Sequence, residues 1–247
     1  MKTLQILMPM GGLGQRFLDG GYTIPKPLIT VDGKEMFLTA LSSFEHMNIP
    51  ITCIFVIRRD QEDKYGLASK IQSILPKAKI VFLEKDTKGA TETALLAKPI
   101  LDQNSPVVVL DCDMKFYSKQ YFDKLTKSFM TGKPDGILLT FPSKDSRYSY
   151  AKTFEGRVIQ TAEKKVISKN AIAGAYYFST AKVFIDAAEE LLSQPITNTL
   201  KEYYVSLIYN ILIGEGKVVE LAAVDKLCSF GTPEELVSYG DGNVKYN

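Results

Sequence analysis

The sequence has one histidine, three cysteines and no tryptophan among its 247 residues. A Ser-His-Asp triad would depend on His46 alone, and His46 lies in a pattern typical of a helix, where a capping or surface role is the simpler interpretation. The cysteines are far apart and form no CxxC or Cys/His cluster, which argues against a zinc site. An odd, sparse set of cysteines also favours a reducing compartment over a disulfide framework.

Long apolar runs and a strong net charge are absent too. No segment approaches the roughly 18 apolar residues of a membrane-spanning helix, and the run in residues 1–10 is too short for a signal peptide. The net charge of +2 argues against a nucleic-acid-binding surface, which is normally strongly basic. We therefore expect a cytoplasmic protein that binds neither nucleic acid nor membrane.

The first part of the chain alternates between apolar runs and helical patterns. Apolar runs that predict strands occupy residues 4–9, 51–57, 79–84, 106–113 and 136–141, and the continuous run at 51–57 is of the type buried on both faces of a parallel sheet. Helical patterns lie between them at residues 36–47, 61–75, 91–101 and 119–130. This succession predicts an α/β fold with three layers, α/β/α, around a mostly parallel central sheet of the Rossmann-like type.

The second part has a different texture. Residues 149–165 alternate polar and apolar side chains and predict a hairpin that turns at Glu155-Gly156. A strand at 171–179, helices at 180–192 and 202–213, a strand at 217–221 and a last helix capped by Thr232 follow. Because no repeat or Pro/Gly-rich linker interrupts the chain, we expect one domain over residues 1–247.

A glycine loop, "MGGLGQR", follows the first predicted strand. Loops at the carboxyl ends of parallel strands bind ligands in open α/β sheets, and glycines let backbone N–H groups approach phosphate oxygens. The loop is not a P-loop, because it lacks the pattern GxxxxGK[ST]. It is not a dinucleotide fingerprint either, because Phe17 stands in place of the third glycine of that fingerprint. By themselves, Gly11, Gly12 and Gly14 fit a tight strand-to-helix turn equally well.

Two cations near this loop favour a phosphate site. Arg16 can donate two parallel hydrogen bonds to a phosphate group. Lys26 lies between Pro25 and Pro27, which restrict the backbone on both sides of it. A lone lysine is usually a solvated surface charge, but that role does not explain so rigid a backbone.

Two aspartates end the strand predicted at 106–113. In a strand, Asp111 and Asp113 would point the same way and Cys112 the other way. Carboxylates at the end of a buried strand need a counter-charge, and Mg²⁺ binds one or two carboxylates together with substrate phosphates. The alternative is that one aspartate caps the next helix.

The segments "GGLGQRF", "IPKPL" and "VDGKEM" together resemble the N-terminal signature of the nucleotidyltransferases that make activated sugars and related head groups. That signature is roughly GGxGxR, PKPL and, after a short strand, K-P-M; Glu35 replaces its last proline here. The resemblance covers nearly the whole chain and looks closest to short members from capsule and polysaccharide biosynthesis. The later segments in the family's order are "KGATETALLAK", "VLDCDM", "AEKK", "AGAYYF", "EYYVSLIYNILI" and "FGTPEEL".

The resemblance implies that residues 1–140 bind an NTP and residues 141–247 bind a phosphorylated acceptor. The acceptor phosphate would attack the α-phosphorus and release pyrophosphate; being anionic already, it needs little help from a general base. The enzyme would position the reactants and stabilise charge with cations, Mg²⁺ among them. The resemblance assigns Arg16 to the triphosphate, Lys26 to the α-phosphate, Asp113 to the metal and Lys164, or Lys165 in another register, to the acceptor phosphate.

The resemblance also assigns binding residues. For the nucleotide these are Met10, Gly11, Gly12, Gly14, Glu84, Gly89, Ala90 and Asp111, and for the acceptor Glu163, Gly174 and Tyr176. The aromatic segment "EYYVSLIYN" lines the acceptor pocket or belongs to the core. The family's second metal ligand stands two residues before G-T, where this chain has Ser229. Asp225 is the nearby candidate metal ligand, although a loop aspartate without a metal is at least as well supported.

Glu84 stands where the family often has a glutamine that contacts the base. A carboxylate accepts hydrogen bonds only, so it would suit the amino group of cytosine and repel O4 of uracil or thymine. This favours CTP, provided that the loop turns Glu84 into the pocket. The acceptor is either a sugar phosphate or a non-sugar phosphate, such as a phosphocholine-like or amide-linked one.

Two other functions share parts of this pattern. A nucleotide-sugar-dependent glycosyltransferase of the related A-type fold also has a DxD-like motif and a metal. Such an enzyme does not attack the α-phosphorus, so it does not need the cations Arg16 and Lys26 around that atom. A non-catalytic nucleotide-sensing subunit is disfavoured by the presence of Arg16, Lys26 and Asp113 together, and favoured by Ser229. Pyrophosphate release separates the transferase from both. A homodimer is a hypothesis that the sequence does not test.

Overall fold

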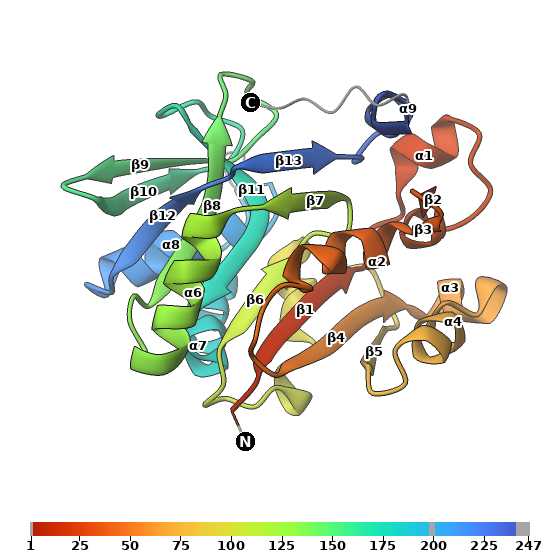
Figure 1. Ribbon diagram of the computed structural model, residues 1–247, viewed down its shortest axis with the longest axis horizontal. Coiled ribbons are helices and arrows are strands. Elements are labelled where there is room, and N and C mark those ends of the chain that lie inside the picture. Colours follow the sequence, from red (N-terminus) through yellow and green to blue (C-terminus); the bar gives the residue numbers. More distant parts are fainter. Residues whose placement is uncertain (1, 198–200, 241–247) are drawn as a thin grey trace.

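The computed structural model describes residues 2–197 and 201–240, and its centre is a nine-stranded sheet (Figure 1). Four parallel neighbours form one part of it, in the order β6-β1-β4-β5. The strands are β1 (Leu4–Met10), β4 (Ile51–Arg58), β5 (Lys79–Leu83), β6 (Val107–Leu110), β8 (Gly136–Pro142), β9 (Tyr150–Phe154), β10 (Arg157–Ala162), β11 (Asn170–Phe178) and β12 (Val219–Ala223).

The remaining strands join this part through β11, which is antiparallel to β6, β8 and β9. Strand β12 pairs in parallel with β8 on the far side of β11, and β10 pairs with β9 as a hairpin. The hairpin turns at Glu155 and Gly156, both with positive φ, as a two-residue type I′ turn requires. The predicted α/β fold with a mostly parallel sheet is therefore confirmed, and β11 makes the sheet mixed.

Helices cover both faces of the sheet because its central strands are apolar on both sides. Along β1, Ile6 belongs to one core cluster and Leu7 to the other. The first cluster includes residues of α2 (Met36–Leu41), α4 (Leu67–Ile74) and α6 (Lys119–Thr131). The second includes residues of α5 (Ala90–Leu95), α7 (Ala181–Ser193) and α8 (Val205–Gly214). The three predicted layers are thus present (Figure 1).

Three predicted helices are shorter than their apolar patterns. The pattern at 61–75 forms α3 (Arg59–Tyr65) and α4, separated by Gly66 with φ of 63°. The pattern at 36–47 forms α2 followed by the 3₁₀ turn η2 (Ser42–Phe44), and that at 91–101 forms α5 and, after a gap, η3 (Lys98–Ile100). Hydrophobic periodicity continues through such turns, so it does not reveal where the α-helix stops.

Two small sheets lie outside the main one and were not predicted in full. Strand β7 (Met114–Tyr117) pairs with β13 (Lys226–Ser229), and β2 (Thr30–Val31) pairs with β3 (Lys34–Glu35). The strand predicted at 106–113 ends at Leu110, so the aspartates that follow lie in a turn. The β7–β13 pair places Ser229 opposite Met114 and so brings the C-terminal segment to this turn.

The other short elements carry the loops around the sheet edge: α1 (Gln15–Asp19), η1 (Lys26–Leu28) and α9 (Pro233–Gly240). Thr232 caps α9 as predicted, since its Oγ1 accepts a hydrogen bond of 3.2 Å from the backbone N–H of Glu235. No helix in residues 2–197 and 201–240 combines the length and apolarity that crossing a membrane requires.

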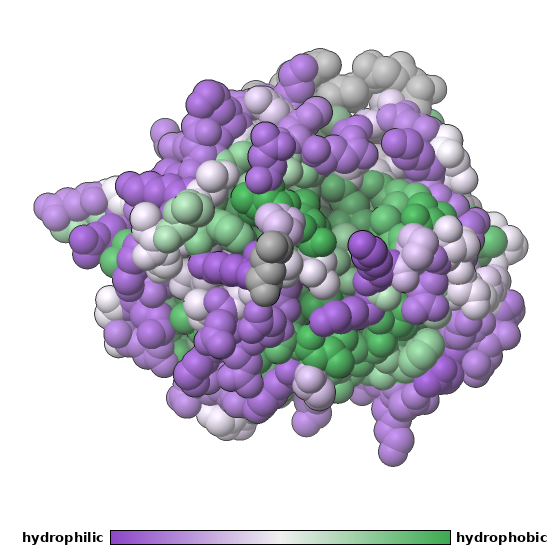
Figure 2. Space-filling model, turned by 60° about the horizontal axis from the view of Figure 1, so that its bottom comes forward, coloured by the Kyte–Doolittle hydropathy of each residue, from purple (hydrophilic) through white to green (hydrophobic). Residues whose placement is uncertain are grey.

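One surface feature is separate from these loops. Figure 2 shows hydrophobic side chains gathered in a hollow near the middle of one face. An apolar cavity of about 510 Å³ lies between α2, α4 and β4, lined among others by Leu38, Phe44, Ile51 and Ile74.

Candidate active site

Three adjoining cavities lie at the edge where β1 and β6 end. These strands are parallel, with Leu7 opposite Val109, so Met10 and Asp111 meet at the same edge of the sheet. The cavities measure about 170, 280 and 230 Å³, and Asp111 lines all three. We call them the first, second and third cavity in that order.

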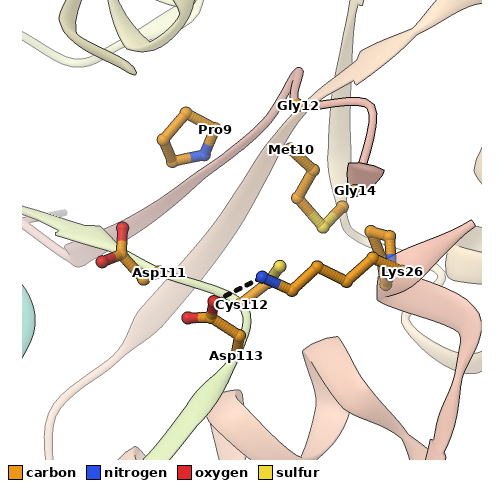
Figure 3. Close-up of a pocket in the computed structure, with 9 residues that line it drawn as sticks. Pro9, Met10, Gly12, Gly14, Lys26, Asp111, Cys112 and Asp113 are labelled. Carbon is orange, nitrogen blue, oxygen red and sulfur yellow. Dashed lines mark hydrogen bonds and ion pairs between the residues drawn. The ribbon is translucent and has the colours of Figure 1, made fainter. Parts of the chain in front are cut away.

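The first cavity is formed by the glycine loop, the start of η1 and the aspartate turn (Figure 3). Gly12 opens into free space, because a Cβ built there would meet nothing within 4 Å. Gly14 has φ of 69°, which favours glycine, and a Cβ would lie 3.1 Å from that of Lys26. Gly11 instead packs against Leu83, 2.8 Å from the position of its missing Cβ. The loop therefore presents exposed backbone at Gly12.

Lys26 reaches across this cavity to Asp113. Pro25 precedes η1, and its carbonyl oxygen accepts a hydrogen bond of 2.8 Å from the N–H of Leu28, which fixes the start of the turn. From this backbone the ammonium forms an ion pair with Asp113 Oδ2 (Figure 3). The two side chains are 20% and 28% exposed, so the pair is largely shielded from water.

Charge and burial set the protonation states in this pair. Burial alone lowers the pKa of Lys26, but the carboxylates of Asp113 and Asp111 outweigh it, and the net pKa is raised. Burial raises the pKa of Asp113, but the Lys26 cation outweighs it and holds the pKa below its usual range. Burial and the neighbouring Asp113 charge raise the pKa of Asp111 to about 7. Near neutral pH the site therefore holds one firm ion pair and one carboxyl that can be protonated.

The second cavity joins α1 to the C-terminal segment. Arg16 lines it, and its charge helps to lower the pKa of Asp113. On the opposite wall, the Glu235 carboxylate accepts hydrogen bonds from Ser229 Oγ at 2.6 Å and from the backbone N–H of Gly231 at 3.0 Å. Its other oxygen pairs with Arg147 Nη1 at 2.8 Å. The wall thus carries a second carboxylate held by three donors.

The third cavity is polar and aromatic. Glu163, Tyr176 and Tyr204 line it. Glu163 Oε2 accepts hydrogen bonds from the hydroxyls of Ser149 and, at 3.0 Å, Ser206. Burial raises the pKa of Glu163 despite these two donors. This cavity can receive a small molecule that offers hydrogen-bond donors to a carboxylate.

Two glycines shape the third cavity. Gly174, on β11, has φ of 27°, and a Cβ there would lie 2.3 Å from Asp111 Oδ2. Its carbonyl oxygen accepts a hydrogen bond of 2.9 Å from the N–H of Asp111. Gly89 lets its loop approach Tyr203, whose backbone N would be 2.7 Å from a Cβ. That approach places Ala90 in the wall of the third cavity.

The structure therefore brings together most of the side chains predicted for the site. Met10, Gly12, Gly14, Lys26, Asp111 and Asp113 meet in the first cavity, Arg16 joins the two aspartates in the second, and Ala90, Glu163, Gly174 and Tyr176 meet in the third. Lys164 is exposed at the rim, where its Nζ donates to the hydroxyl of Tyr204 at 3.0 Å. Cys112 lines the first cavity with both aspartates, because the turn replaces the expected alternation of a strand.

Two predicted site residues lie elsewhere. Asp225 Oδ2 accepts a hydrogen bond of 2.7 Å from the N–H of Lys119 at the start of α6. Lys226, the next residue, is paired with Tyr117 at one end of the β7–β13 ladder, whereas Asp113 precedes Met114 at the other end, so Asp225 is remote from Asp113. Glu84 is 63% exposed and pairs with Arg59 at 3.2 Å, outside all three cavities. The structure therefore brings neither Asp225 nor Glu84 into the three cavities.

Sequence reasoning missed Arg147 as a site residue and took Glu235 only for part of a helix start. Arg147 lines the second and third cavities, and Glu235 lines the second. Arg147 is a charged residue in a loop that no motif marks, and Glu235 lies in the segment "FGTPEEL", where the sequence indicated only the start of a helix. Tyr204 was covered by the aromatic segment that we expected in the pocket or the core; it lines the third cavity, whereas Tyr203 and Tyr209 are buried.

Comparisons with known proteins agree with this fold. A nucleoside-diphosphate-sugar pyrophosphorylase from Vibrio cholerae RC9 superposes with a TM-score of 0.79 at 26% identity, over 95% of this chain and 98% of that one. The inositol-1-phosphate CTP transferase from T. maritima has the same fold, with a TM-score of 0.72 at 15% identity over 98% of this chain and 97% of that one.

Among curated proteins, the bifunctional protein GlmU of Sulfurovum sp. (strain NBC37-1) is 24% identical over 230 residues. That match covers 91% of this chain, which spans only about half of that relative's length, 50%. The family described as "Nucleotidyl transferase" matches residues 5–207. Because that match takes in most of the chain, including the glycine loop, Lys26, both aspartates and Glu163, the protein belongs to the nucleotidyl transferase family.

Proposed function

We propose that this protein transfers a nucleotidyl group from an NTP to a phosphorylated small molecule and releases pyrophosphate. The observation that carries the proposal is the shielded Lys26–Asp113 ion pair beside the open backbone of Gly12, in a chain of this family. The Vibrio cholerae structure is that of a nucleoside-diphosphate-sugar pyrophosphorylase, so a sugar phosphate is the first acceptor class that we propose.

The nucleotide would occupy the first cavity and extend toward the second. The backbone near Gly12 leaves room for close approach, and Arg16 and Lys26 supply cations for the phosphates. Asp111 lies between the first and third cavities, where it can face the ribose or the acceptor. We propose that the acceptor fills the third cavity, with Glu163 and Tyr176 around it and with Lys164 and Arg147 available for its phosphate.

The residues fit a Mg²⁺ ion at Asp113. The donor is a carboxylate, the ligand type that Mg²⁺ prefers, and the missing side chain of Gly231 leaves space beside Asp113 Oδ2, at 3.0 Å from where its Cβ would be. No cluster of three or more His, Cys, Asp or Glu residues suited to a metal occurs in residues 2–197 and 201–240. Substrate phosphates and water would therefore complete the coordination, and the bound cation would offset charge that develops on the phosphates.

The reaction needs positioning more than proton transfer. An oxygen of the acceptor phosphate forms a bond to the α-phosphorus, the bond from that phosphorus to the bridging oxygen of the β-phosphate breaks, and pyrophosphate leaves with its electron pair. The attacking phosphate is already anionic, so no general base is required. Lys26 remains protonated at any pH in the working range, since its pKa is raised, and it can stabilise the charge of the transition state.

The choice of nucleotide is a separate proposal. CTP is the nucleotide that the sequence favours through Glu84, and a precursor for capsule or surface polysaccharide is the product class that goes with it. The pairing of the exposed Glu84 with Arg59 gives that choice no support. The base preference therefore depends on a direct comparison of nucleotides.

The test is pyrophosphate release, with Mg²⁺, from ATP, GTP, CTP and UTP or TTP against a panel of phosphorylated sugars, amino alcohols and amides. We expect release with one nucleotide and one acceptor class, and loss of at least 100-fold in rate for Lys26→Met. Lys124→Met is the matched control, because Lys124 forms a comparably shielded ion pair with Glu220 on α6 and β12, away from the cavities. Sugar transfer without pyrophosphate, or nucleotide binding without turnover across the whole panel, would contradict the proposal.

A further inference from the structure

Gly231 separates two carboxylates in the second cavity. A Cβ built on Gly231 would lie 3.0 Å from Asp113 Oδ2 and 3.5 Å from Glu235 Oε2. Both oxygens therefore approach the same point from different elements, the aspartate turn after β6 and the first turn of α9. Any side chain at position 231 would fill the space between them, so glycine leaves room there for a small ligand.

Backbone contacts fix the segment that carries Glu235. Ser229 is opposite Met114 in the β7–β13 ladder, and the N–H of Phe230 donates to the carbonyl oxygen of Asp113 at 2.9 Å. Thr232 then caps α9 through the N–H of Glu235. The position of Glu235 relative to Asp113 is thus set by hydrogen bonds on both sides of Gly231.

The bonding of Glu235 leaves capacity for a cation. A carboxylate offers about four acceptor positions. Ser229 Oγ and the N–H of Gly231 use both positions on Oε2, and Arg147 uses one on Oε1, so one position remains, on Oε1. Ser229 has a neutral hydroxyl, which here serves to orient Glu235 rather than to supply charge.

We propose that Glu235 is the second carboxylate of the Mg²⁺ site, acting with Asp113 across Gly231 and held in place by Ser229. The inference rests on the proposed nucleotidyltransferase function, in which a divalent cation held by this site would offset the charge of the phosphates. Two carboxylates with phosphate and water ligands match the usual Mg²⁺ environment. The proposal also assigns a partner to Asp113 in place of Asp225, which accepts a hydrogen bond from the N–H of Lys119 instead.

The experiment measures metal binding without turnover. Mn²⁺ is titrated into the purified protein, and bound and free ion are followed by electron paramagnetic resonance and water-proton relaxation. Glu235→Gln keeps the size and an acceptor oxygen, and we expect it to weaken Mn²⁺ binding at least tenfold. Glu234→Gln is the matched control, since Glu234 lies on the same turn but lines none of the three cavities, and it should bind Mn²⁺ like the wild type.

A rescue variant separates a metal ligand from a structural tie between α9 and Arg147. Ser229→Asp combined with Glu235→Gln returns a carboxylate to this wall and should restore Mn²⁺ affinity to within about threefold of the wild type. Ser229→Asn with Glu235→Gln has the same shape without the charge and should not. If Glu235 is only a structural tie, Arg147→Gln and Glu235→Gln will lower the melting temperature alike and leave Mn²⁺ affinity unchanged, which would overturn the proposal.

The two proposals can fail separately. Mn²⁺ binding that depends on Glu235 and Asp113, without pyrophosphate release for any substrate pair, would keep the metal site and reject the function. Pyrophosphate release with an unchanged Mn²⁺ dissociation constant in Glu235→Gln would keep the function and reject Glu235 as a ligand.

Discussion

Replacing Lys26 by methionine is expected to destabilise the protein through the carboxylate that it leaves behind. Methionine keeps most of the apolar part of the lysine side chain, so little packing is lost. The substitution does remove the ion-pair partner of Asp113. Breaking a fully buried ion pair costs about 3–5 kcal/mol, and an exposed one about 0–1 kcal/mol. With side chains 20% and 28% exposed, we expect about 2 kcal/mol, or a melting temperature lower by about 4–8 °C.

The loss depends on pH in a direction that the pKa shifts determine. The folded-state pKa of Asp113 is lowered, so its stabilising contribution is present above the unfolded pKa of about 4 and is lost as the pH falls through the lower folded value. The folded-state pKa of Lys26 is raised, so its contribution is complete below about 10.4 and is lost as the pH rises through the folded value. The ion pair therefore stabilises the wild type from about pH 4 to pH 10.

Without Lys26, burial makes the pKa of Asp113 rise above its unfolded value. The variant then loses stability as the pH increases from about 4 toward 7, and its difference from the wild type widens. Urea unfolding of wild type, Lys26→Met, Asp113→Asn and the double variant between pH 4.5 and 8 measures this. We expect the double variant to be more stable than Lys26→Met. An equal loss at pH 4.5 and pH 8, or additive single effects, would refute the electrostatic explanation; Lys124→Met controls for loss of a shielded lysine.

Three further predictions concern the walls of the cavities. Gly174→Ala should cost about 1–3 kcal/mol in urea unfolding and weaken NTP binding in calorimetry, because its Cβ would overlap Asp111; Gly216→Ala, with positive φ but open space, should cost less and leave binding intact. Glu84→Gln should leave the ranking of kcat/KM among nucleotides unchanged, and a loss confined to CTP would contradict this. The KM for the acceptor should fall as the pH rises through the raised pKa of Glu163 and its carboxylate forms, whereas Glu163→Gln should give a flat profile.

Much of the central sheet was predictable from local patterns. Strands such as β1 and β4 are continuous apolar runs because both of their faces are covered, and their bounds differ little from the predicted ones. The break between α3 and α4 also had a visible signal, Gly66, inside the apolar pattern. Such features depend on residues close in sequence, which is why a pattern reveals them.

The second cavity could not be predicted in the same way. Strands β7 and β13 have four residues each, carry charged side chains, and are held together by pairing between segments more than a hundred residues apart. Asp225 was chosen because it is near Ser229 in sequence, but four residues of strand span about 13 Å. Glu235 is farther from Ser229 in sequence than Asp225 is. The turn at Gly231 nevertheless brings Glu235 back toward Asp113.

The same geometry explains why a site for a polyanion can contain two carboxylates. Each proposed metal ligand is paired with a cation, Asp113 with Lys26 and Glu235 with Arg147. A divalent cation would be held by these two carboxylates, and Lys26 and Arg147 would then be available to the phosphates. The carboxylates would have a counter-charge with or without the metal, which offsets the cost of desolvating them. The ion pairs hold the cations close to where the phosphates would lie, so little reorganisation is needed when the substrates arrive.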